Sequence, residues 1–329
     1  MPPPVWACPQ CLGPLRAGTE AARCSSCATT YRRRGGIWRF LPAQRAAAYA
    51  SFAEQYEIVR REEGWGHSEG AYYRSLPIVQ RDDPNRNIWR VRGATFRSFL
   101  RCILAPLERS GDGPLRVVDV GAGNGWLAYQ LTSRGHRPAA VDLRTDAFDG
   151  LGAHVHYDRH FDAIQADFNA LPLGSSQFDL AVFNGSLHYS RDCQVTIEEA
   201  LRVLRPGGML VVMDSPIYRR RQSGERMVRQ RARAFTSRFG FAGDAVSSEH
   251  FLTHERLHQL ADAANLSWSV FRPALGMRWM LRPVAARLLG RGEPADHFVL
   301  AAEKPSGDGG SPSHGREPRQ RLLFRGELT

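Results

Sequence analysis

Apolar and polar positions between residues 115 and 302 form two alternating kinds of segment. Short, almost wholly apolar runs are typical of strands buried on both faces, and longer runs with an apolar period near 3.6 residues are typical of helices. The runs expected as strands are 115–120, 138–142, 161–167, 178–183, 209–214, 267–271 and 297–302. Helices are expected near 125–134, 144–152 and 192–204, and after Thr253. This alternation predicts an α/β domain in which helices wrap a parallel sheet.

The first 112 residues follow a different pattern. Short β-type stretches occupy the start of the chain, and the following segment has a helical period that Gly64 and Gly66 interrupt. After Lys304, Ser, Gly, Pro and charged residues dominate, which is typical of disorder. We therefore expect four parts: a small module at 1–41, a helical cap at 42–112, the α/β domain at 113–304 and a disordered tail at 305–329.

A glycine-rich turn follows the first strand of the α/β domain. Residues 117–125 read VVDVGAGNG, so a buried strand runs directly into a turn that opens a helix. Glycines in such a turn permit positive φ and let a ligand approach the backbone. The dinucleotide fingerprint does not fit, because Trp126 stands where its third glycine would be. The acidic Asp119 would repel a pyrophosphate, but it suits a ligand with an ammonium group, such as S-adenosylmethionine.

Acidic residues also end the next two strands. Asp142 ends the second strand, where a carboxylate accepts hydrogen bonds from both ribose hydroxyls of a nucleoside. Asp167 follows the third strand, where it is suited to the amino group of adenine, with Phe168 packing on the base. The fourth strand leads into Asn184 and then His188.

This series of motifs resembles the class I S-adenosylmethionine-dependent methyltransferases, particularly the subgroup called type 11, over residues 113–304. The resemblance implies a Rossmann-like sheet of seven strands, mostly parallel with the last strand reversed, and a cofactor bound over the carboxyl ends of the first and second strands. A structural domain with a degenerate site is the alternative, and the intact motifs disfavour it. The resemblance implies that the cofactor contacts are Asp119, Gly121, Ala122, Gly123 and Gly125 in the loop, Asp142 and Leu143 at ribose and adenine, Asp167 and Phe168 at the adenine edge, and Asn184 beside the sulfonium.

Four of the six cysteines form two C-x2-C pairs near the N-terminus. Two such knuckles give a tetrahedral all-thiolate zinc site, which leaves no open position for catalysis. Two local disulfides or inert thiols are the alternatives. We expect a structural Zn²⁺ bound by Cys8, Cys11, Cys24 and Cys27.

A four-cysteine ribbon before a helical cap and a class I domain resembles the bacterial ribosomal RNA guanine methyltransferases. It also resembles a broader set of bacterial methyltransferases. The similarity in the ribbon is limited to cysteine spacing and a few glycines, so it favours an RNA acceptor without establishing one.

The net charge of +11 is only modest evidence for an anionic partner such as a nucleic acid. Arginine supplies nearly all of the basic residues, since Lys304 is the only lysine, and this bias is typical of a genome-wide codon preference. Basic charge still attracts anionic partners. The segment 218–238 holds eight arginines and one acidic residue, so it is either a cap helix with an anion-binding face or an ordinary solvated helix.

His188 is the candidate general base, since it follows the fourth strand on the side where the cofactor's methyl would project. Its alternative role is a hydrogen bond to the loop backbone. Arg60, Glu63 and Trp65 form either a lid beside a glycine hinge or ordinary core. Three further histidines are expected on the surface or the pocket rim rather than on a metal: His154, His156 and His160.

Three functions remain open at this stage. The first, slightly favoured, is methyl transfer to a small metabolite; the second is methylation of an RNA base; the third is a non-catalytic module whose ribbon binds a partner. The acceptor is unidentified, and an anionic one agrees with the charge. No secretory signal or membrane span is visible, so we expect a cytoplasmic enzyme without a membrane partner and in an unspecified oligomeric state.

Overall fold

The computed structural model describes residues 4–111, 113–240, 248–290 and 292–306, without the side chains of residues 51 and 52. Nearly all of the predicted tail, 305–329, lies outside these residues. Within them, no helix has both the length and the hydrophobicity needed to cross a lipid bilayer.

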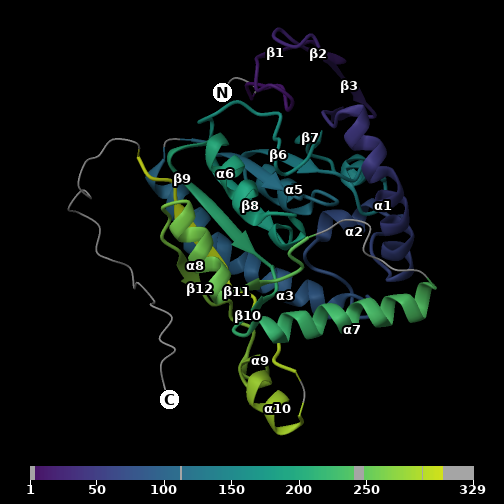
Figure 1. Cartoon of the computed structure of the whole chain (residues 1–329), viewed down its shortest axis with the longest axis vertical. Helices are drawn as coiled ribbons and strands as arrows, with labels where there is room; N and C mark the ends of the chain where they lie inside the picture. The colour runs from purple at the N-terminus through teal and green to yellow at the C-terminus, as the bar shows by residue number, and fades with distance from the viewer. Residues whose placement is uncertain (1–3, 112, 241–247, 291, 307–329) are drawn as a thin grey trace.

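A mixed sheet of seven strands forms the centre of the α/β domain (Figure 1). Its order is β7-β6-β5-β8-β9-β13-β12, and β13 runs antiparallel to both of its neighbours. The predicted seven-stranded α/β fold, with the last strand reversed, is therefore confirmed. The strands are β5 (Arg116–Val120), β6 (Arg137–Asp142), β7 (Asp162–Gln165), β8 (Phe178–Asn184), β9 (Leu204–Met213), β12 (Ser269–Phe271) and β13 (Val299–Glu303).

Helices cover both faces of this sheet because successive residues of each central strand point to opposite sides. Val118 and Val120 of β5 pack in the same cluster as α6 (Cys193–Val203) and α8 (His254–Ala263). Val117 packs in the cluster of α5 (Trp126–Thr132) and α3 (Arg86–Phe99). A π-helical turn, η1 (Leu100–Leu104), and α4 (Ala105–Ser110) continue α3. The carboxyl ends of the parallel strands stay free of these layers and form one edge.

The helix expected near 144–152 is wrong. The chain forms a turn there, followed by the 3₁₀ helix η2 (Leu151–His156). The cause is local: the Asp146 carboxylate accepts hydrogen bonds from the backbone N–H groups of Phe148, Asp149 and Gly150. A side chain that binds these donors competes with helix formation.

The N-terminal module continues the sheet instead of standing apart from it. Its strands β1 (Leu15–Ala17), β2 (Ala21–Cys24), β3 (Thr30–Arg34) and β4 (Ile37–Arg39) pair antiparallel with one another. Strand β4 then pairs parallel with β7, so that the whole sheet has 11 strands. Trp6, Tyr31, Trp38 and Phe40 form an aromatic cluster behind this junction.

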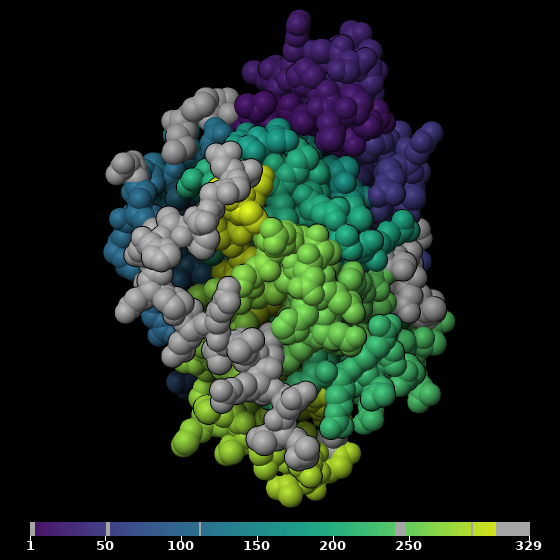
Figure 2. Space-filling model, turned by 60° about the vertical axis from the view of Figure 1, so that its left-hand side comes forward, coloured from purple at the N-terminus to yellow at the C-terminus, as the bar shows by residue number. Residues whose placement is uncertain are grey.

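The cap is built mostly from helices at the carboxyl edge of the sheet. From the N-terminal side come α1 (Ala43–Glu62) and α2 (Gly70–Ser75). From the far side comes α7 (Arg221–Phe239), which lies between the paired strands β10 (Ile217–Tyr218) and β11 (Leu252–Thr253) in sequence. The short helices α9 (Met277–Met280) and α10 (Arg282–Leu288) project at the end of the molecule opposite the N-terminal module (Figures 1 and 2).

Candidate active site

The glycine turn after β5 is held against the end of β6. The backbone N–H groups of Gly121 and Ala122 both donate to the carbonyl oxygen of Val141, at 2.8 and 3.0 Å. Gly121, Gly123 and Gly125 have φ of +77°, +56° and +80°, which is the left-handed region that favours glycine. A Cβ on Gly121 would lie 2.3 Å from the Cβ of Ser186, so the turn approaches the loop after β8 closely.

In β5 and at the end of β8, side-chain oxygen atoms are buried without a hydrogen-bond partner among the described residues. Neither carboxylate oxygen of Asp119 has a hydrogen-bond partner among the described residues, and Asp119 is completely buried. The same holds for the side-chain oxygen of Asn184 at the end of the adjacent strand β8. Burial, with a smaller contribution from the negative charge of Asp142, raises the pKa of Asp119 to about 8. Because buried polar groups in folded proteins are nearly always bonded, these atoms indicate a missing polar ligand.

Asp142 lies beside them, at the end of β6. One of its oxygens accepts from the N–H of Gly123 and the other from the N–H of Arg144, both at 2.8 Å. Burial raises the pKa of Asp142, although Arg144 and the two backbone bonds act in the opposite direction. The backbone carbonyl of the following Leu143 accepts from Gln165 on β7 at 2.9 Å. The structure thus brings Asp119, Asp142 and the glycine turn together, as predicted.

A buried ion-pair cluster below the turn was not predicted. The Arg60 guanidinium of α1 donates to Asp149 at 2.6 Å, and Arg144 contacts the same oxygen at 3.1 Å. Asn124 of the glycine turn donates to the other oxygen of Asp149 at 3.3 Å. Although burial acts to raise it, the pKa of Asp149 is lowered by Arg60 and Arg144. The alternating charges of 142–149 were the available signal, but they do not reveal Arg60 as the partner.

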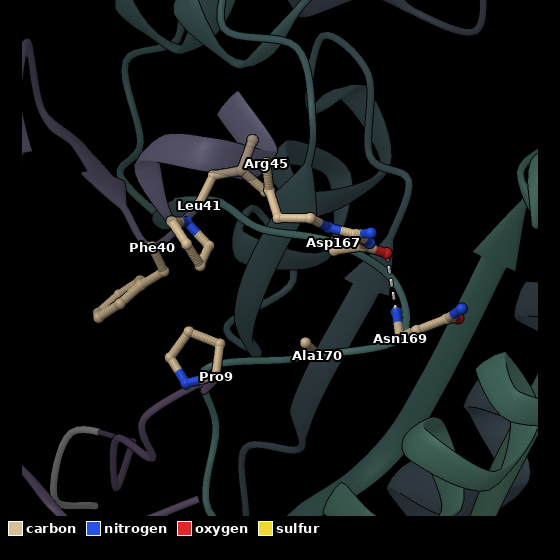
Figure 3. A pocket seen from close by; sticks show the side chains of 8 residues that line it. Pro9, Phe40, Leu41, Arg45, Asp167, Asn169 and Ala170 are labelled. Carbon is tan, nitrogen blue, oxygen red and sulfur yellow. Dashed lines mark hydrogen bonds and ion pairs between the residues drawn. The ribbon is translucent and has the colours of Figure 1, made fainter. Parts of the chain in front are cut away.

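Asp167 has partners from the cap helix α1 and from its own loop. Arg45 forms an ion pair with it, and the Asn169 N–H donates to it at 3.1 Å (Figure 3). Tyr49 donates to it at 3.2 Å. Arg45, Asp167 and Asn169 line a cavity of about 160 Å³ that Pro9 and Phe40 also line. The predicted adenine contact through Asp167 therefore requires Arg45 or Tyr49 to move or to share the carboxylate.

Phe168, the residue after Asp167, packs against the glycine turn. Its ring carbon Cζ is 3.0 Å from the position of a Cβ on Gly121. This places the ring next to the predicted cofactor loop, in agreement with packing against the ligand.

His188 is buried in η3 (Leu187–Tyr189), directly after β8. Its Nδ1 lies 3.1 Å from the Ser215 hydroxyl, and its backbone carbonyl accepts from His250 at 2.8 Å. Burial lowers the pKa of His188 to about 3, and the positive charge of Arg231 acts in the same direction. The imidazole is therefore neutral at pH 7, and its environment disfavours the imidazolium that a general base must become.

Three basic or phenolic side chains from different elements face the same end of β8. Arg92 of α3 places Nη2 4.0 Å from the position of a Cβ on Gly185. Burial raises the pKa of Tyr189, but Arg231 of α7 and Arg60 outweigh this effect, so that the net pKa is lowered. The carboxyl edge beyond the glycine turn therefore carries a positive field.

The other predicted cap residues have structural partners. The indole Nε1 of Trp65 donates to Glu63 at 3.1 Å, and the Arg60 guanidinium stacks 3.8 Å from the centre of the Trp65 ring. His154 contacts the Gly35 carbonyl at 2.9 Å, and His156 stacks on Tyr73 with ring centres 4.4 Å apart. Across the described ranges, the N-terminal cysteines are the only group of three or more potential ligands close enough to hold a metal.

Those four cysteines converge as expected. Their sulfur atoms lie within 4.8 Å of one another, with Cys8 3.6 Å from Cys27 and Cys11 3.5 Å from Cys24. A tetrahedral site with Zn–S bonds of about 2.3 Å has S···S edges of about 3.8 Å. All four are free thiols, so the two local disulfides are not formed. The backbone N–H groups of Ser26 and Cys27 donate to the Cys24 sulfur at 3.3 and 3.4 Å, as in a metal knuckle.

Residues 118–212 match the sequence model of a family described as a methyltransferase domain. The match runs from β5 to β9 and includes the glycine turn and the predicted positions at the ends of β6, β7 and β8. This part of the chain is therefore a methyltransferase domain.

Several curated relatives are methyltransferases. Malonyl-[acyl-carrier protein] O-methyltransferases from Enterobacter lignolyticus and Hahella chejuensis are each 34% identical, over 95 and 110 residues, or 29% and 33% of this chain and 37% and 39% of the relatives. A demethylmenaquinone methyltransferase from Clavibacter sepedonicus is 28% identical over 130 residues, 40% of this chain and 48% of the relative. The chain thus spans less than half the length of each relative. Their names state different acceptors.

Among solved structures, the chain is similar to the 1,6-didemethyltoxoflavin-N1-methyltransferase of Burkholderia thailandensis. The two are 16% identical, the TM-score is 0.47, and 88% of this chain and 100% of that chain are covered.

Proposed function

We propose that this protein transfers the methyl group of S-adenosylmethionine to a small-molecule acceptor bound between the carboxyl edge of the sheet and the cap. The methyltransferase domain at residues 118–212 supports the reaction class. The single observation that carries the assignment of the cofactor is the pair of partnerless polar side chains, Asp119 and Asn184, beside a positive-φ glycine turn. This set of groups suits a ligand with an ammonium group and a nucleoside.

The chain's own residues have separate tasks in this proposal. The glycine turn, Asp119 and Asn184 hold the methionine end of the cofactor, Asp142 with Leu143 holds the ribose, and Phe168 packs on the base. S-adenosylmethionine, when bound, supplies an electrophilic methyl group. The protein contributes mainly by fixing the acceptor in line with that methyl group and by excluding water. The Arg60–Asp149 ion pair fastens α1 over the site and so contributes to the exclusion of water.

We further propose that Cys8, Cys11, Cys24 and Cys27 bind one structural zinc ion. Four thiolates complete a tetrahedral shell, so the ion serves the fold of the module. The parallel pairing of β4 with β7 couples that module to the strand that precedes Asp167.

The closed arrangement of the cap supports a small acceptor. Elements from both sides of the site, α1 and α7, approach the carboxyl edge through Arg60, Arg231 and Tyr189.

An RNA acceptor is the second candidate, because strand β3 exposes a row of arginines on the surface of the module: Arg32, Arg33 and Arg34. A basic surface of this kind attracts phosphates.

The test has two stages. Calorimetry with S-adenosylhomocysteine should give one binding site per chain, and Asp142→Ala should weaken binding about 10- to 100-fold because it removes hydrogen bonds to a charged group. A chain that does not bind S-adenosylhomocysteine contradicts the proposal. Methyl-labelled S-adenosylmethionine is then supplied with either a metabolite extract or total RNA from the same cells. Label in the metabolite fraction supports a small-molecule acceptor. Label in RNA contradicts that proposal and supports an RNA acceptor instead.

A further inference from the structure

Arg92 reaches the proposed reaction site without forming an ion pair to a carboxylate of the described residues. It lies in the middle of α3, half-buried, and its side chain reaches to Gly185, the residue after Asn184. The guanidinium lies against two adjoining indole rings, 5.1 Å from the centre of Trp65 and 4.8 Å from that of Trp89. These rings orient the guanidinium without neutralising it.

Carboxylates compensate the charge of Arg92 only in part, because they act on it from beyond ion-pair distance. Over the described residues, no carboxylate oxygen lies within the 4.0 Å of an ion pair with Arg92. Among the carboxylates, Asp214 has the largest effect on Arg92. It accepts a hydrogen bond from Thr95 at 2.8 Å, and burial raises the pKa of Asp214 to about 6 although Arg92 acts to lower it. Burial also lowers the pKa of Arg92 itself, because a guanidinium loses hydration there. An arginine held in this way is suited to a planar anion from outside the chain.

The surrounding charges favour the same kind of ligand. Arg60 is paired with Asp149, and Arg144 is paired with both Asp149 and Asp146, so two carboxylates balance these two arginines. Arg231 approaches from α7 and also has no carboxylate within ion-pair distance in the described part of the chain; it acts on the Tyr189 hydroxyl. Arg92 and, from α7, Arg231 are thus two arginines at this edge without an ion pair to a carboxylate of the described residues.

His188, the predicted general base, is poorly suited to remove a proton. His188 bonds to Ser215 and lies in the field of Arg92 and Arg231, which opposes its protonation. The Tyr189 hydroxyl interacts with Tyr56 and Arg231. An alcohol or a protonated amine would need a base before it could accept a methyl group, whereas an ionised acid needs none.

We propose that the acceptor is a carboxylic acid, that Arg92 binds its ionised carboxylate at the end of β8, and that this carboxylate is itself methylated to a methyl ester. The inference rests on the proposed methyltransferase function. One carboxylate oxygen forms the new bond to the methyl carbon while the carbon–sulfur bond of the sulfonium breaks and its electron pair goes to sulfur. The products are a neutral ester and neutral S-adenosylhomocysteine, and no proton is released.

The first experiment identifies the bond formed. The zinc-loaded full chain is incubated with methyl-labelled S-adenosylmethionine and a metabolite extract, and the labelled products are treated with alkali. Methyl esters release the label as volatile methanol, so release of most of the label supports the inference. Label that stays in an alkali-stable product overturns the inference and leaves the proposed function intact. The absence of any transfer contradicts the proposed function, and the inference falls with it.

The second experiment assigns Arg92. Arg92→Gln should lower ester formation at least about 100-fold, and Arg92→Lys should restore part of it, since the charge returns without the planar fork. The dissociation constant for S-adenosylhomocysteine should stay within about twofold in both variants. Arg90→Gln, an exposed arginine on the same helix, is the matched control and should behave as wild type.

The affinity of Arg92→Gln for S-adenosylhomocysteine can overturn the assignment of Arg92 to the acceptor. If Arg92→Gln weakens S-adenosylhomocysteine binding tenfold or more while the acceptor still saturates the enzyme normally, Arg92 binds the cofactor's own carboxylate. That result overturns the assignment to the acceptor. Circular dichroism and the melting temperature of both Arg92 variants exclude loss of fold as the cause.

Discussion

Asp119 shows how a single residue couples the fold to the ligand. Its carboxyl group is fully buried in β5 and has no hydrogen-bond partner among the described residues. In the absence of ligand, its charged form is costly, since the raised pKa, about 8, favours the protonated form. We expect the ammonium group of the cofactor to favour the ionised form instead. Cofactor binding and proton release at Asp119 would then be linked.

This linkage gives a pH-dependent stability with a definite sign. The folded-state pKa of Asp119, about 8, exceeds the ordinary value of 3.8, so the folded protein binds a proton more tightly than the unfolded chain. The contribution of Asp119 to the free energy of unfolding is therefore greatest at low pH and falls as the pH rises from about 4 to about 8.

Asp119→Asn should remove that dependence. The variant should be more stable than wild type at pH 8, by about 2–4 kcal/mol, and this advantage should shrink towards pH 5. Urea unfolding of the ligand-free proteins at both pH values measures it. The same variant should bind S-adenosylhomocysteine at least about tenfold more weakly, because the ammonium group loses its carboxylate. A stability difference that does not vary between pH 5 and pH 8 would contradict the role of Asp119.

At the scale of elements, the packing of α7 against the rest of the protein depends on one glycine. Gly224 is the only buried residue among the 19 of this helix. A Cβ at that position would lie 2.3 Å from the Phe251 ring, which belongs to the segment before β11. The helix brings Arg231 to Tyr189, so the contact at Gly224 sets the distance between α7 and the proposed acceptor site.

Gly224→Ala should therefore move α7 outward and impair turnover more than stability. We expect the KM for the acceptor to rise about tenfold, because Arg231 loses its place, with kcat less affected. The melting temperature should change by less than about 3 °C, since alanine favours the helix by about 1 kcal/mol over glycine and offsets part of the lost packing. Initial rates of methyl transfer into the metabolite extract measure the first effect, and a thermal scan measures the second.

Gln230→Ala, at an exposed position of the same helix, is the matched control. It should leave both quantities unchanged. A Gly224→Ala variant with normal KM would show that α7 does not help to form the site.

At the scale of the whole molecule, the proposed zinc ion acts on the cofactor site through the sheet. The cysteine cluster holds β1–β4 together, β4 pairs with β7, and Asp167 follows β7 with Arg45 of the adjoining helix against it. Cys11→Ser should remove about one zinc per chain and lower the melting temperature by about 5–10 °C. It should also weaken S-adenosylhomocysteine binding about three- to tenfold, because the strand before Asp167 loses its neighbour.

Elemental analysis, thermal scans and calorimetry measure these three effects. Cys102→Ser, outside the cluster, should retain zinc and behave as wild type. Full zinc content in Cys11→Ser, or normal cofactor binding after zinc loss, would contradict the proposed coupling.

The sequence predicted what local patterns encode. Apolar runs located the seven strands, and the glycine turn with Asp119 and Asp142 located the candidate cofactor site, because a strand and the turn after it are adjacent in sequence. Residues 144–152 were mistaken for a helix because a single side chain, Asp146, captured the backbone donors.

Long-range partners were not predictable in the same way. The pairing of β4 with β7 joins segments more than 120 residues apart, and neither segment's pattern identifies the other. Arg92 and Arg60 are ordinary helical arginines in the sequence. Their positions at the site become visible only in the folded structure, where α3 brings Arg92 to the end of β8 and α1 brings Arg60 to Asp149.

The junction of β4 with β7 also determines which surface ends the sheet. Without β1–β4, the apolar strand β7, with Ala163 and Ile164 buried, would present an open row of backbone donors and acceptors to other chains. The N-terminal module replaces that edge with β1, three residues long and carrying the exposed Arg16. Short, charged edges oppose edge-to-edge association. We therefore expect the module to protect the protein against aggregation, and a chain shortened to begin at α1 should precipitate even where its own core is intact.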